Sequence, residues 1–132
     1  MAGVQERYLV CPYETVWDAA VDTMKDRPIT VKDKAGGMIE TDWMEMDAAV
    51  RSYGMFGRDA SHRERARMTI SVKQLNDVTS VSLSENREVW HRKGGVTSQA
   101  TKWWPVDPSE ETMAAILSRL NAKLKERGCS PS

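Results

Sequence analysis

The segment from Asp107 to Gly128 constrains the fold more than any other part of this 132-residue chain. Asp107 suits a helix N-cap, Pro108 suits the first helical position, and Gly128 suits a C-cap. The pattern predicts a helix over about 108–127 whose apolar stripe must be buried against another element. That stripe consists of Met113, Ile116, Leu117, Leu120 and Leu124.

A second helix is predicted over about 13–25, in the stretch "YETVWDAAVDTM". Pro28 ends it, because a proline disfavours helical conformation in the residue before it. Two helices with one apolar face each require a shared surface to cover. The stripe of this helix consists of Val16, Trp17, Ala20, Val21 and Met24.

Alternating polar and apolar residues predict strands elsewhere. They occur in "RYLVC", in the hairpin "ITVKDKAGGMIETDWMEM", and in "ARMTISVKQL" followed by "VTSVSLSENREVWH". The expected fold is α+β, an antiparallel sheet packed on one face by two helices, in the order β-α-β-β-β-β-α. We expect a single domain over 1–132, with a folded core of about 7–127 and a flexible tail, 128–132.

The expected core is formed by the apolar residues of these faces. Trp43 follows Ile39 and Thr41 in the strand alternation, so we expect it on the helix-facing side as a core or core-edge anchor. The competing interpretation places Trp43 in a groove between sheet and helices that holds an apolar ligand. The expected core residues are Val16, Trp17, Val21, Ile29, Val31, Ile39, Met68, Ile70, Val72, Val81, Leu83, Ile116, Leu117, Leu120 and Leu124.

The charges of the chain cancel but are unevenly distributed. Nineteen Lys and Arg balance nineteen Asp and Glu, which gives no global argument for nucleic-acid or membrane binding. Residues 1–50 carry five basic and ten acidic side chains, whereas residues 51–106 carry ten basic and five acidic ones. The basic middle can meet an acidic partner, although most such charges simply solvate the surface.

Candidate catalytic groups are few. His62 and His91 lie among charged residues without a neighbouring nucleophile, which favours surface histidines. Cys11 precedes a helix start, where a thiol can be activated, but a buried structural cysteine is the favoured interpretation. Cys11 and Cys129 can pair only if the end of the chain folds back, so their redox state stays open. We expect no enzyme and no cofactor.

Neither a metal site nor a nucleic-acid site is favoured by the remaining polar residues. Strand alternation separates Glu40 and Asp42 from Glu45 and Asp47, which argues against one cation site. A basic set interleaved with tryptophans could stack on single-stranded nucleic acid, but the acidic first third opposes it. That set is Arg58, Arg63, Arg65, Arg67, Arg87, Arg92, Lys93 and Lys102, with Trp90, Trp103 and Trp104.

The helix "YETVWDAAVDTM", the hairpin "ITVKDKAGGMIETDW", the alternating strands and the closing helix resemble the BamC-like (NlpB-type) lipoprotein domains of Gram-negative bacteria. The resemblance covers about residues 7–127, and its most specific part is Gly37, Ile39, Thr41 and Trp43. It implies a helix-grip fold and a non-catalytic binding or scaffold role in a bacterial envelope lipoprotein, similar to a component of outer-membrane protein assembly.

The same resemblance implies a position on the periplasmic side of the outer membrane. No apolar run reaches the roughly 18–20 residues that span a bilayer. Membrane attachment is therefore expected only through a lipid anchor outside these residues, and a cytoplasmic location stays open. The expected partner is an envelope protein, and no nucleic acid is expected.

A partner site is predicted in the segments 47–65 and 86–106, because loops on a rigid scaffold commonly carry binding function. Trp, Tyr and Arg are frequent anchors of interfaces. The alternative is that these aromatic residues only cover the ends of the sheet. The alternative function is a small apolar-ligand carrier that uses a groove between helix and sheet. The hypothetical patch, facing an acidic surface, consists of Tyr53, Phe56, Arg58, Trp90, Arg92 and Trp103.

Overall fold

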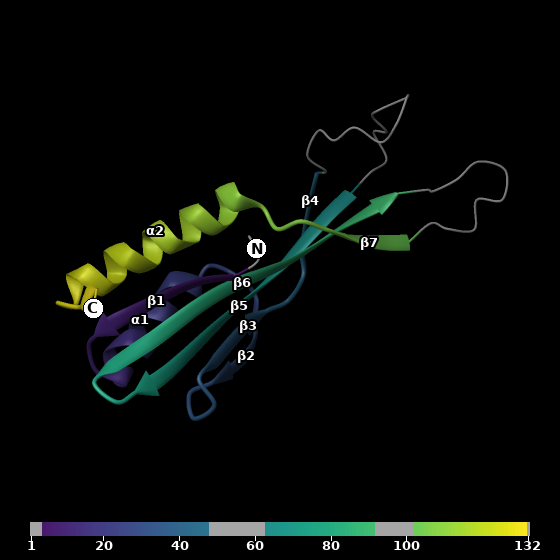
Figure 1. Ribbon diagram of the computed structural model, residues 1–132. Coiled ribbons are helices and arrows are strands. Elements are labelled where there is room, and N and C mark those ends of the chain that lie inside the picture. The colour runs from purple at the N-terminus through teal and green to yellow at the C-terminus, as the bar shows by residue number, and fades with distance from the viewer. Residues whose placement is uncertain (1–3, 48–62, 92–101, 132) are drawn as a thin grey trace, which may run out of the picture.

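The computed structural model describes residues 4–47, 63–91 and 102–131. Within these ranges an eight-stranded antiparallel sheet carries two helices on one face (Figure 1), so the expected α+β, helix-grip-like arrangement is confirmed. In chain order the elements are β1 (Val4–Val10), α1 (Tyr13–Met24), β2 (Ile29–Asp33), β3 (Met38–Thr41), β4 (Met44–Asp47), β5 (Arg63–Leu75), β6 (Val78–His91), β7 (Lys102–Val106), α2 (Glu110–Glu126) and β8 (Ser130–Pro131).

The hairpin of β5 and β6 is the central unit of the sheet. Its thirteen cross-strand pairs run from Arg63–Trp90 to Leu75–Val78. The turn places Asn76 at φ 50°, a left-handed conformation that asparagine tolerates. The strand order is β2-β3-β5-β6-β1-β8, with β4 also pairing with β5 and β7 with β6. β4 and β7 thus extend the hairpin into an arm beyond the helix-covered body (Figure 1).

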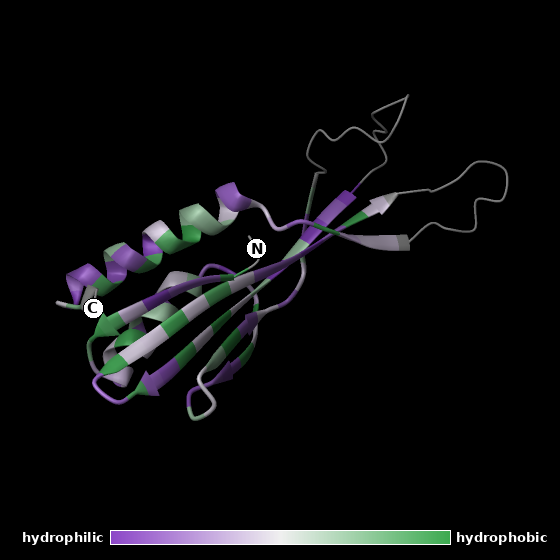
Figure 2. Cartoon of the chain, in the orientation of Figure 1, coloured by the Kyte–Doolittle hydropathy of each residue, from purple (hydrophilic) through white to green (hydrophobic). Residues whose placement is uncertain are grey.

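The core lies between the body of the sheet and both helices. Figure 2 shows apolar residues alternating along the strands of the body. Most of the expected core residues are buried in one cluster. Val21 and Ile29 are only partly buried against that cluster, and Val31 is half-buried. The periodic stripe of α2 is confirmed, since all five of its residues, Met113, Ile116, Leu117, Leu120 and Leu124, are buried.

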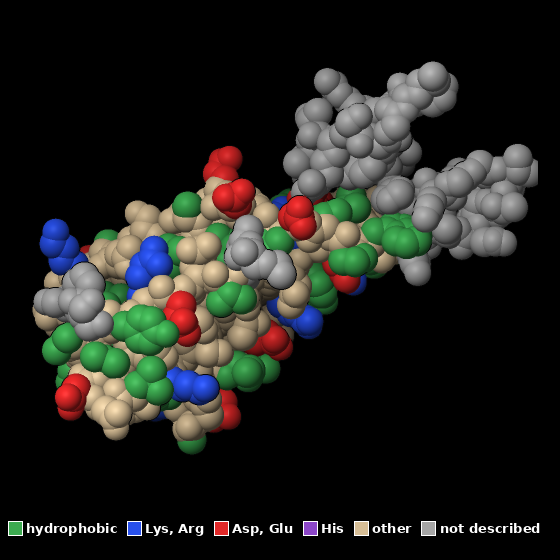
Figure 3. Space-filling model, in the orientation of Figure 1, with side chains coloured by type: hydrophobic (Ala, Val, Ile, Leu, Met, Phe, Trp, Pro, Cys, Tyr) green, Lys and Arg blue, Asp and Glu red, His purple; other side chains and the backbone are tan. Residues whose placement is uncertain are grey.

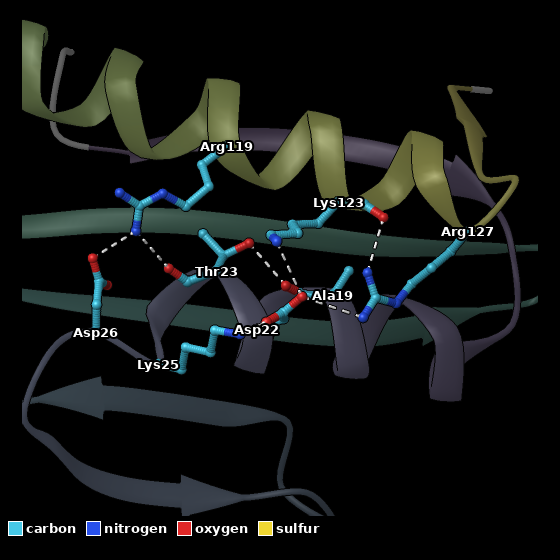
Figure 4. Close-up of polar contacts among 8 residues, drawn as sticks. All are labelled: Ala19, Asp22, Thr23, Lys25, Asp26, Arg119, Lys123 and Arg127. Atoms are coloured by element: carbon cyan, nitrogen blue, oxygen red, sulfur yellow. Dashed lines mark hydrogen bonds and ion pairs between the residues drawn. The ribbon is translucent and has the colours of Figure 1, made fainter.

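A polar seam closes the contact between the two helices on its outer side (Figure 4). Arg119 Nη1 contacts Asp26 Oδ2 at 2.9 Å and donates to the carbonyl of Thr23 at 3.2 Å. Asp22 lies within ion-pair distance of Lys25 at 2.8 Å and of Lys123 at 3.3 Å. Hydrogen bonding from Lys25, with a further contribution from Lys123, lowers the pKa of Asp22 to about 2.

The end of the chain is fastened to its beginning. A disulfide joins Cys11 and Cys129 across a sequence separation of 118, with Cα atoms 5.4 Å apart. β8 then pairs with the end of β1 through Leu9–Pro131 and Val10–Ser130. The prediction of a flexible tail from residue 128 therefore differs from the structure, in which Cys129 is buried. The reason is tertiary, because the covalent bond and a strand partner anchor a segment of unremarkable sequence.

No helix in the described ranges is both long enough and apolar enough to cross a membrane.

Candidate binding site at the waist of the sheet

The sheet narrows to two strands at one level of the β5–β6 hairpin. Beside β5, the pairs with β3 end at Thr69, and the pairs with β4 begin at Ala66. Beside β6, the pairs with β1 end at Ser84, and those with β7 begin at Arg87. Two cross-strand pairs therefore have no described strand on either flank. We call this level the waist, and it consists of the pairs Arg67–Asn86 and Met68–Glu85.

The two pairs of the waist point to opposite faces of the sheet, because side chains alternate along a strand. Met68 and Glu85 are buried on the helix side, at 0% and 4% exposure. The amide of Met68 donates to the side chain of Thr41 at 3.0 Å, which replaces a strand hydrogen bond at the break between β3 and β4. Arg67 and Asn86 belong to the outer face, which the helices do not cover.

A buried ionic cluster lies on the helix side of the waist. The guanidinium of Arg87 forms two parallel hydrogen bonds with Glu85, Nε to Oε1 at 2.9 Å and Nη2 to Oε2 at 3.0 Å. Its Nη1 contacts Glu64 Oε2 at 2.5 Å. All three side chains are buried, so their charges require these partners. Burial opposes the charged form, but the hydrogen bonds that the guanidinium donates to Glu85 and Glu64 outweigh it and raise the pKa of Arg87.

The same cluster fixes the start of α2. Glu85 Oε1 accepts a hydrogen bond from the amide of Ser109 at 2.7 Å. The hydroxyl of Ser109 in turn accepts from the amide of Thr112 at 3.1 Å, so Ser109 is the N-cap. The prediction of Asp107 as the cap was wrong by two residues. Asp107 matched the local sequence pattern, whereas the buried carboxylate of Glu85 selects the actual helix start.

The outer face carries an alternating stack of arginines and tryptophans. The guanidinium carbon of Arg65 lies 4.2 Å from the ring centre of Trp43 and 4.1 Å from that of Trp103. Arg67 lies 4.7 Å from the same Trp43 ring. Each such cation–π contact contributes about 0.5–2 kcal/mol, depending on solvent exposure. We call the complete set the arginine–tryptophan ladder, and its members are Trp43, Arg63, Arg65, Arg67, Trp90 and Trp103.

The arm end of the ladder is aromatic. Trp90 and Trp103 meet edge to face, with ring centres 5.6 Å apart. Arg63 lies 5.6 Å from the ring centre of Trp103. Figure 3 shows one face of the molecule, on which hydrophobic side chains gather on the arm at β7. The arm thus places a rigid aromatic pair next to the arginines.

The arginines of the ladder differ in their charge partners. Arg63 Nε contacts Glu45 Oε1 at 2.8 Å, and Arg65 Nε contacts Glu88 Oε1 at 2.9 Å. Arg67 faces Asn86, a neutral residue, and has no carboxylate partner among the described residues. Its Nε is buried without a hydrogen-bond acceptor in the described part of the chain. The ladder therefore holds one uncompensated cation at the waist.

A groove of about 530 Å³ opens beside this cation. Arg67 and Asn86 of the hairpin line it together with Trp43, which lies between β3 and β4. Pro105 of β7 and Pro108, in the segment that joins β7 to α2, also line it. Its position follows from the strand order, because β1 ends and β7 begins on either side of the waist. The arrangement can receive a small anionic group between an aromatic wall and a proline wall.

Trp43 lies on the outer face, so the prediction that it faces the helices with Ile39 was wrong. Strand alternation does not continue through this segment. The amide of Asp42 bonds the carbonyl of Pro28 at 2.7 Å, and the amide of Trp43 bonds the side chain of Asp42 at 2.7 Å. This break separates β3 from β4 and reverses the direction of Trp43. The competing prediction, in which Trp43 lines a groove between sheet and helices, was wrong for the same reason.

The structure brings together two residues of the predicted partner patch, Trp90 and Trp103. The other four residues of that patch, Tyr53, Phe56, Arg58 and Arg92, lie outside the described residues. Sequence reasoning grouped Arg65 and Arg67 with these tryptophans only in the disfavoured nucleic-acid set, left both out of the partner patch, and placed Trp43 in neither. The available signal was the spacing of Arg63, Arg65 and Arg67 on one strand face.

The other groups considered for chemistry have structural partners. Cys11 is in the disulfide, so it carries no free thiol. Glu40 accepts a hydrogen bond from Thr69 at 3.3 Å, and Glu45 pairs with Arg63. In the described part of the chain no three His, Cys, Asp or Glu side chains are grouped to hold a metal ion. His62 and the side chain of His91 lie outside that part.

Two further grooves lie between β1 and α2, at the edge of the sheet. Their volumes are about 400 and 530 Å³, and Arg7 and Asn121 line both. The larger one also contains Tyr8, Leu9 and Leu124. The space between the sheet and the helices is filled by side chains such as Leu120 at 0% exposure. An apolar ligand would therefore meet this molecule at the β1–α2 edge.

The fold defines a small α+β domain whose sheet is covered by helices on one face only. The chain belongs to the family described as a domain of unknown function, DUF3576, which matches residues 13–120. The comparison with curated proteins finds no match.

Two solved structures are similar at low levels. A DUF4468 family protein from Bacteroides ovatus ATCC 8483 is 16% identical, with a TM-score of 0.43. The match covers 83% of this chain and 63% of that one, so this chain spans under two thirds of its relative. An uncharacterized protein from Bacillus thuringiensis is 13% identical, with a TM-score of 0.36 and coverage of 94% and 96%.

Proposed function

We propose that this chain is a non-catalytic binding or scaffold domain of a bacterial envelope lipoprotein, and that it contacts a protein partner through the arginine–tryptophan ladder. The ladder is the observation that carries the proposal. Its members are held in place by mutual stacking, with Arg65 between Trp43 and Trp103. Tryptophan and arginine dominate the energetics of many interfaces, and side chains that are already ordered lose little entropy on binding.

The proposed compartment is supported by the disulfide. Disulfides persist in oxidising compartments such as the periplasm and are rare in the cytosol. The bond between Cys11 and Cys129 uses both cysteines of the chain. The BamC-like resemblance of the segment "GGMIETDW" supports the same compartment and an envelope lipoprotein. The lipid anchor of this proposal lies outside the 132 residues.

An acidic partner surface is the best match to this face. Arg67 contributes a positive charge that no described carboxylate neutralises. Opposite charges across an interface steer association and favour the correct partner. The paired arginines of the ladder add contact area and hydrogen-bond geometry, but little net charge.

The proposal is tested by site-specific photocrosslinking in cells that express the chain naturally. A photoreactive residue replaces Asn86, an exposed position beside Arg67, and a control copy carries it at Lys32 on β2. We expect one discrete protein adduct at position 86 that is lost in Arg65→Ala and Arg67→Glu. The matched control is Lys73→Glu, an exposed lysine on the same face of β5. Equal yields of crosslinked protein at positions 86 and 32 would show that the ladder is not the binding face.

The compartment is tested separately by trapping thiols in intact cells. Alkylation before and after reduction reports whether Cys11 and Cys129 are paired in vivo. We expect labelling only after reduction. Complete labelling before reduction would contradict an oxidising compartment without affecting the ladder.

The second candidate function is an apolar-ligand carrier, and the larger β1–α2 groove favours it. Tyr8, Leu9 and Leu124 give that groove an apolar lining. A fatty-acid analogue with a fluorescent head group tests this function by titration. Saturable binding that is lost in Tyr8→Asp, a change at an exposed residue of the groove, and retained in Arg67→Glu would favour the carrier over the partner-binding domain.

A further inference from the structure

We infer that the groove at the waist is a carboxylate-binding subsite, in which Arg67 receives the side-chain carboxylate of an Asp or Glu in the partner. This inference rests on the proposed function, because it assigns the partner's chemistry at the same face. The subsite consists of Trp43, Arg67, Asn86, Pro105 and Pro108 around the 530 Å³ groove.

The first argument is that the register leaves Arg67 without a counter-charge. Arg65 lies directly opposite Glu88, and the two form an ion pair. Arg67 lies directly opposite Asn86, which has no charge. The breaks beside the waist also remove the flanking strands that could offer a carboxylate. Nε itself is buried, so an incoming carboxylate meets the terminal N–H groups of the half-buried Arg67, which have no carboxylate partner among the described residues either.

The second argument is that Trp43 orients the guanidinium. The centre of its ring lies 4.2 Å from the guanidinium carbon of Arg65 and 4.7 Å from that of Arg67. These contacts restrict the orientation of the indole and of both guanidinium groups. Stacking uses the flat face of a guanidinium and leaves its N–H groups available in the plane. Those groups form a fork that matches a carboxylate with two parallel hydrogen bonds.

The third argument concerns the charge of the ligand. Glu85, Glu88 and Arg87 also line the groove. Both carboxylates are engaged, Glu85 with Arg87 and Glu88 with Arg65. Arg87 is shared by Glu85 and Glu64, so this cluster adds no positive charge to the groove. Arg67 is left as the cation for the ligand, and one carboxylate is enough to pair with it. A doubly charged phosphate would bring excess negative charge towards two carboxylates.

The position of the groove favours a side chain over a chain terminus. The ladder continues from the waist to Trp103 and Trp90 on the arm. A partner that covers this length presents residues on both sides of the groove. The carboxylate in the groove then belongs to an internal Asp or Glu, and apolar neighbours of that residue contact the ladder.

The inference is tested by NMR titration of the arginine Nε–H signals in the intact, disulfide-bonded protein. The ligand is N-acetyl-phenylalanyl-glutamate amide. The isosteric glutamine amide lacks the carboxylate, and the glutamine peptide with a free C-terminus moves the carboxylate to the chain end. We expect a saturable shift of the Arg67 signal with the glutamate amide. Binding of the glutamine amide should be about tenfold weaker or weaker still, as loss of one charged hydrogen bond implies.

Variants then locate the effect. Arg67→Gln should abolish the saturable response, and Arg67→Lys should weaken it, because lysine keeps the charge without the fork. Lys73→Gln removes a charge from the same strand face outside the groove, and should leave the response unchanged. The titration of the unmodified protein stands on its own even if a variant at position 67 folds poorly.

Several results would overturn the inference. One is a non-saturating shift, or an equal response to the glutamate and glutamine amides. Preference for the free C-terminus would replace the side-chain carboxylate with a terminal one. The proposed function fails separately. If the peptide binds at Arg67 but no adduct forms at position 86 in cells, then the subsite stands and the partner-binding role does not. If the adduct persists in Arg67→Gln while the peptide titration fails, then the partner-binding role stands and the carboxylate subsite does not.

Discussion

Arg67 and Asn86 face each other across the β5–β6 hairpin, at the level where both flanking strands are interrupted. A cationic residue thus lies opposite a neutral one, although the neighbouring pair on the same face, Arg65–Glu88, is an ion pair. Arg65 therefore has its counter-charge within the domain, whereas Arg67 is open to the carboxylate of a ligand.

Asn86→Asp should therefore close the site from within. An aspartate opposite Arg67 forms a cross-strand ion pair, which we expect to raise stability by about 0.2–1 kcal/mol. Urea unfolding measures this gain, and the same variant should lose the peptide response. Asn86→Gln is the control and should retain binding. A stabilised Asn86→Asp protein that still binds would show that Arg67 is not the anchor.

Removal of Arg87 should be far more damaging than removal of an exposed arginine. Arg87→Ala removes the guanidinium that pairs with the buried Glu64 and Glu85, which we expect to cost about 3–5 kcal/mol. Arg119→Ala breaks an exposed pair with Asp26 and should cost about 0–1 kcal/mol. Chemical denaturation of both variants gives the comparison. Similar costs for the two would mean that the buried cluster is not energetically linked to folding.

The stripe of α2 should behave as a core face. Leu120→Ala or Leu117→Ala should cost about 2–5 kcal/mol, because each removes buried methyl groups that neighbours cannot fully replace. Ser118→Ala, at an exposed position on the same helix, is the control and should be nearly neutral. A small effect at both leucines would show that the helix packs loosely on the sheet.

Loss of the disulfide should lower stability by about 2–5 kcal/mol, because the bond restricts the unfolded chain. The double variant Cys11→Ser, Cys129→Ser isolates this effect without leaving a free thiol. Unfolding of the unmodified protein with and without a reductant provides a second measurement. A variant as stable as the oxidised protein would show that packing of Cys129 alone secures the end of the chain.

The seam between the helices predicts an acid-dependent contribution from Asp22. Its pKa is lowered from 3.8 to about 2 in the folded state, first by hydrogen bonding from Lys25. The unfolded chain therefore binds a proton more readily, and the contribution is fully present above about pH 4. It is lost as the pH falls towards 2. The stability difference between the unmodified protein and Asp22→Asn should shrink over this window, and the carboxyl carbon shift of Asp22 reports the pKa directly.

The sequence predicted the elements whose patterns are long and regular. The stripes of α1 and α2 and the alternation from Met68 to Leu83 gave the architecture, since burial of one face determines both patterns. The direction of the Trp43 side chain could not be predicted. The irregular backbone at Asp42 and Trp43, between β3 and β4, reverses which residues face the helices. Ser109 replaced Asp107 as the helix cap because of Glu85, a residue far away in the sequence.

The candidate site was less accessible to sequence reasoning. β7 escaped prediction because "KWWPV" is short and contains a proline, and its pairing with β6 brings Trp103 to Arg65. The waist depends on the register of several strand pairs at once. The disulfide likewise requires that two segments 118 residues apart meet in space.

The bond between Cys11 and Cys129 also determines how the domain responds to mechanical load. All of the sheet from β2 to β7 and both helices lie within the covalent loop that it closes. A pull applied to the chain before Cys11 and after Cys129 passes through the sulfur atoms and bypasses everything between them. Strands that would otherwise unzip under tension therefore stay paired while the chain on either side is stretched.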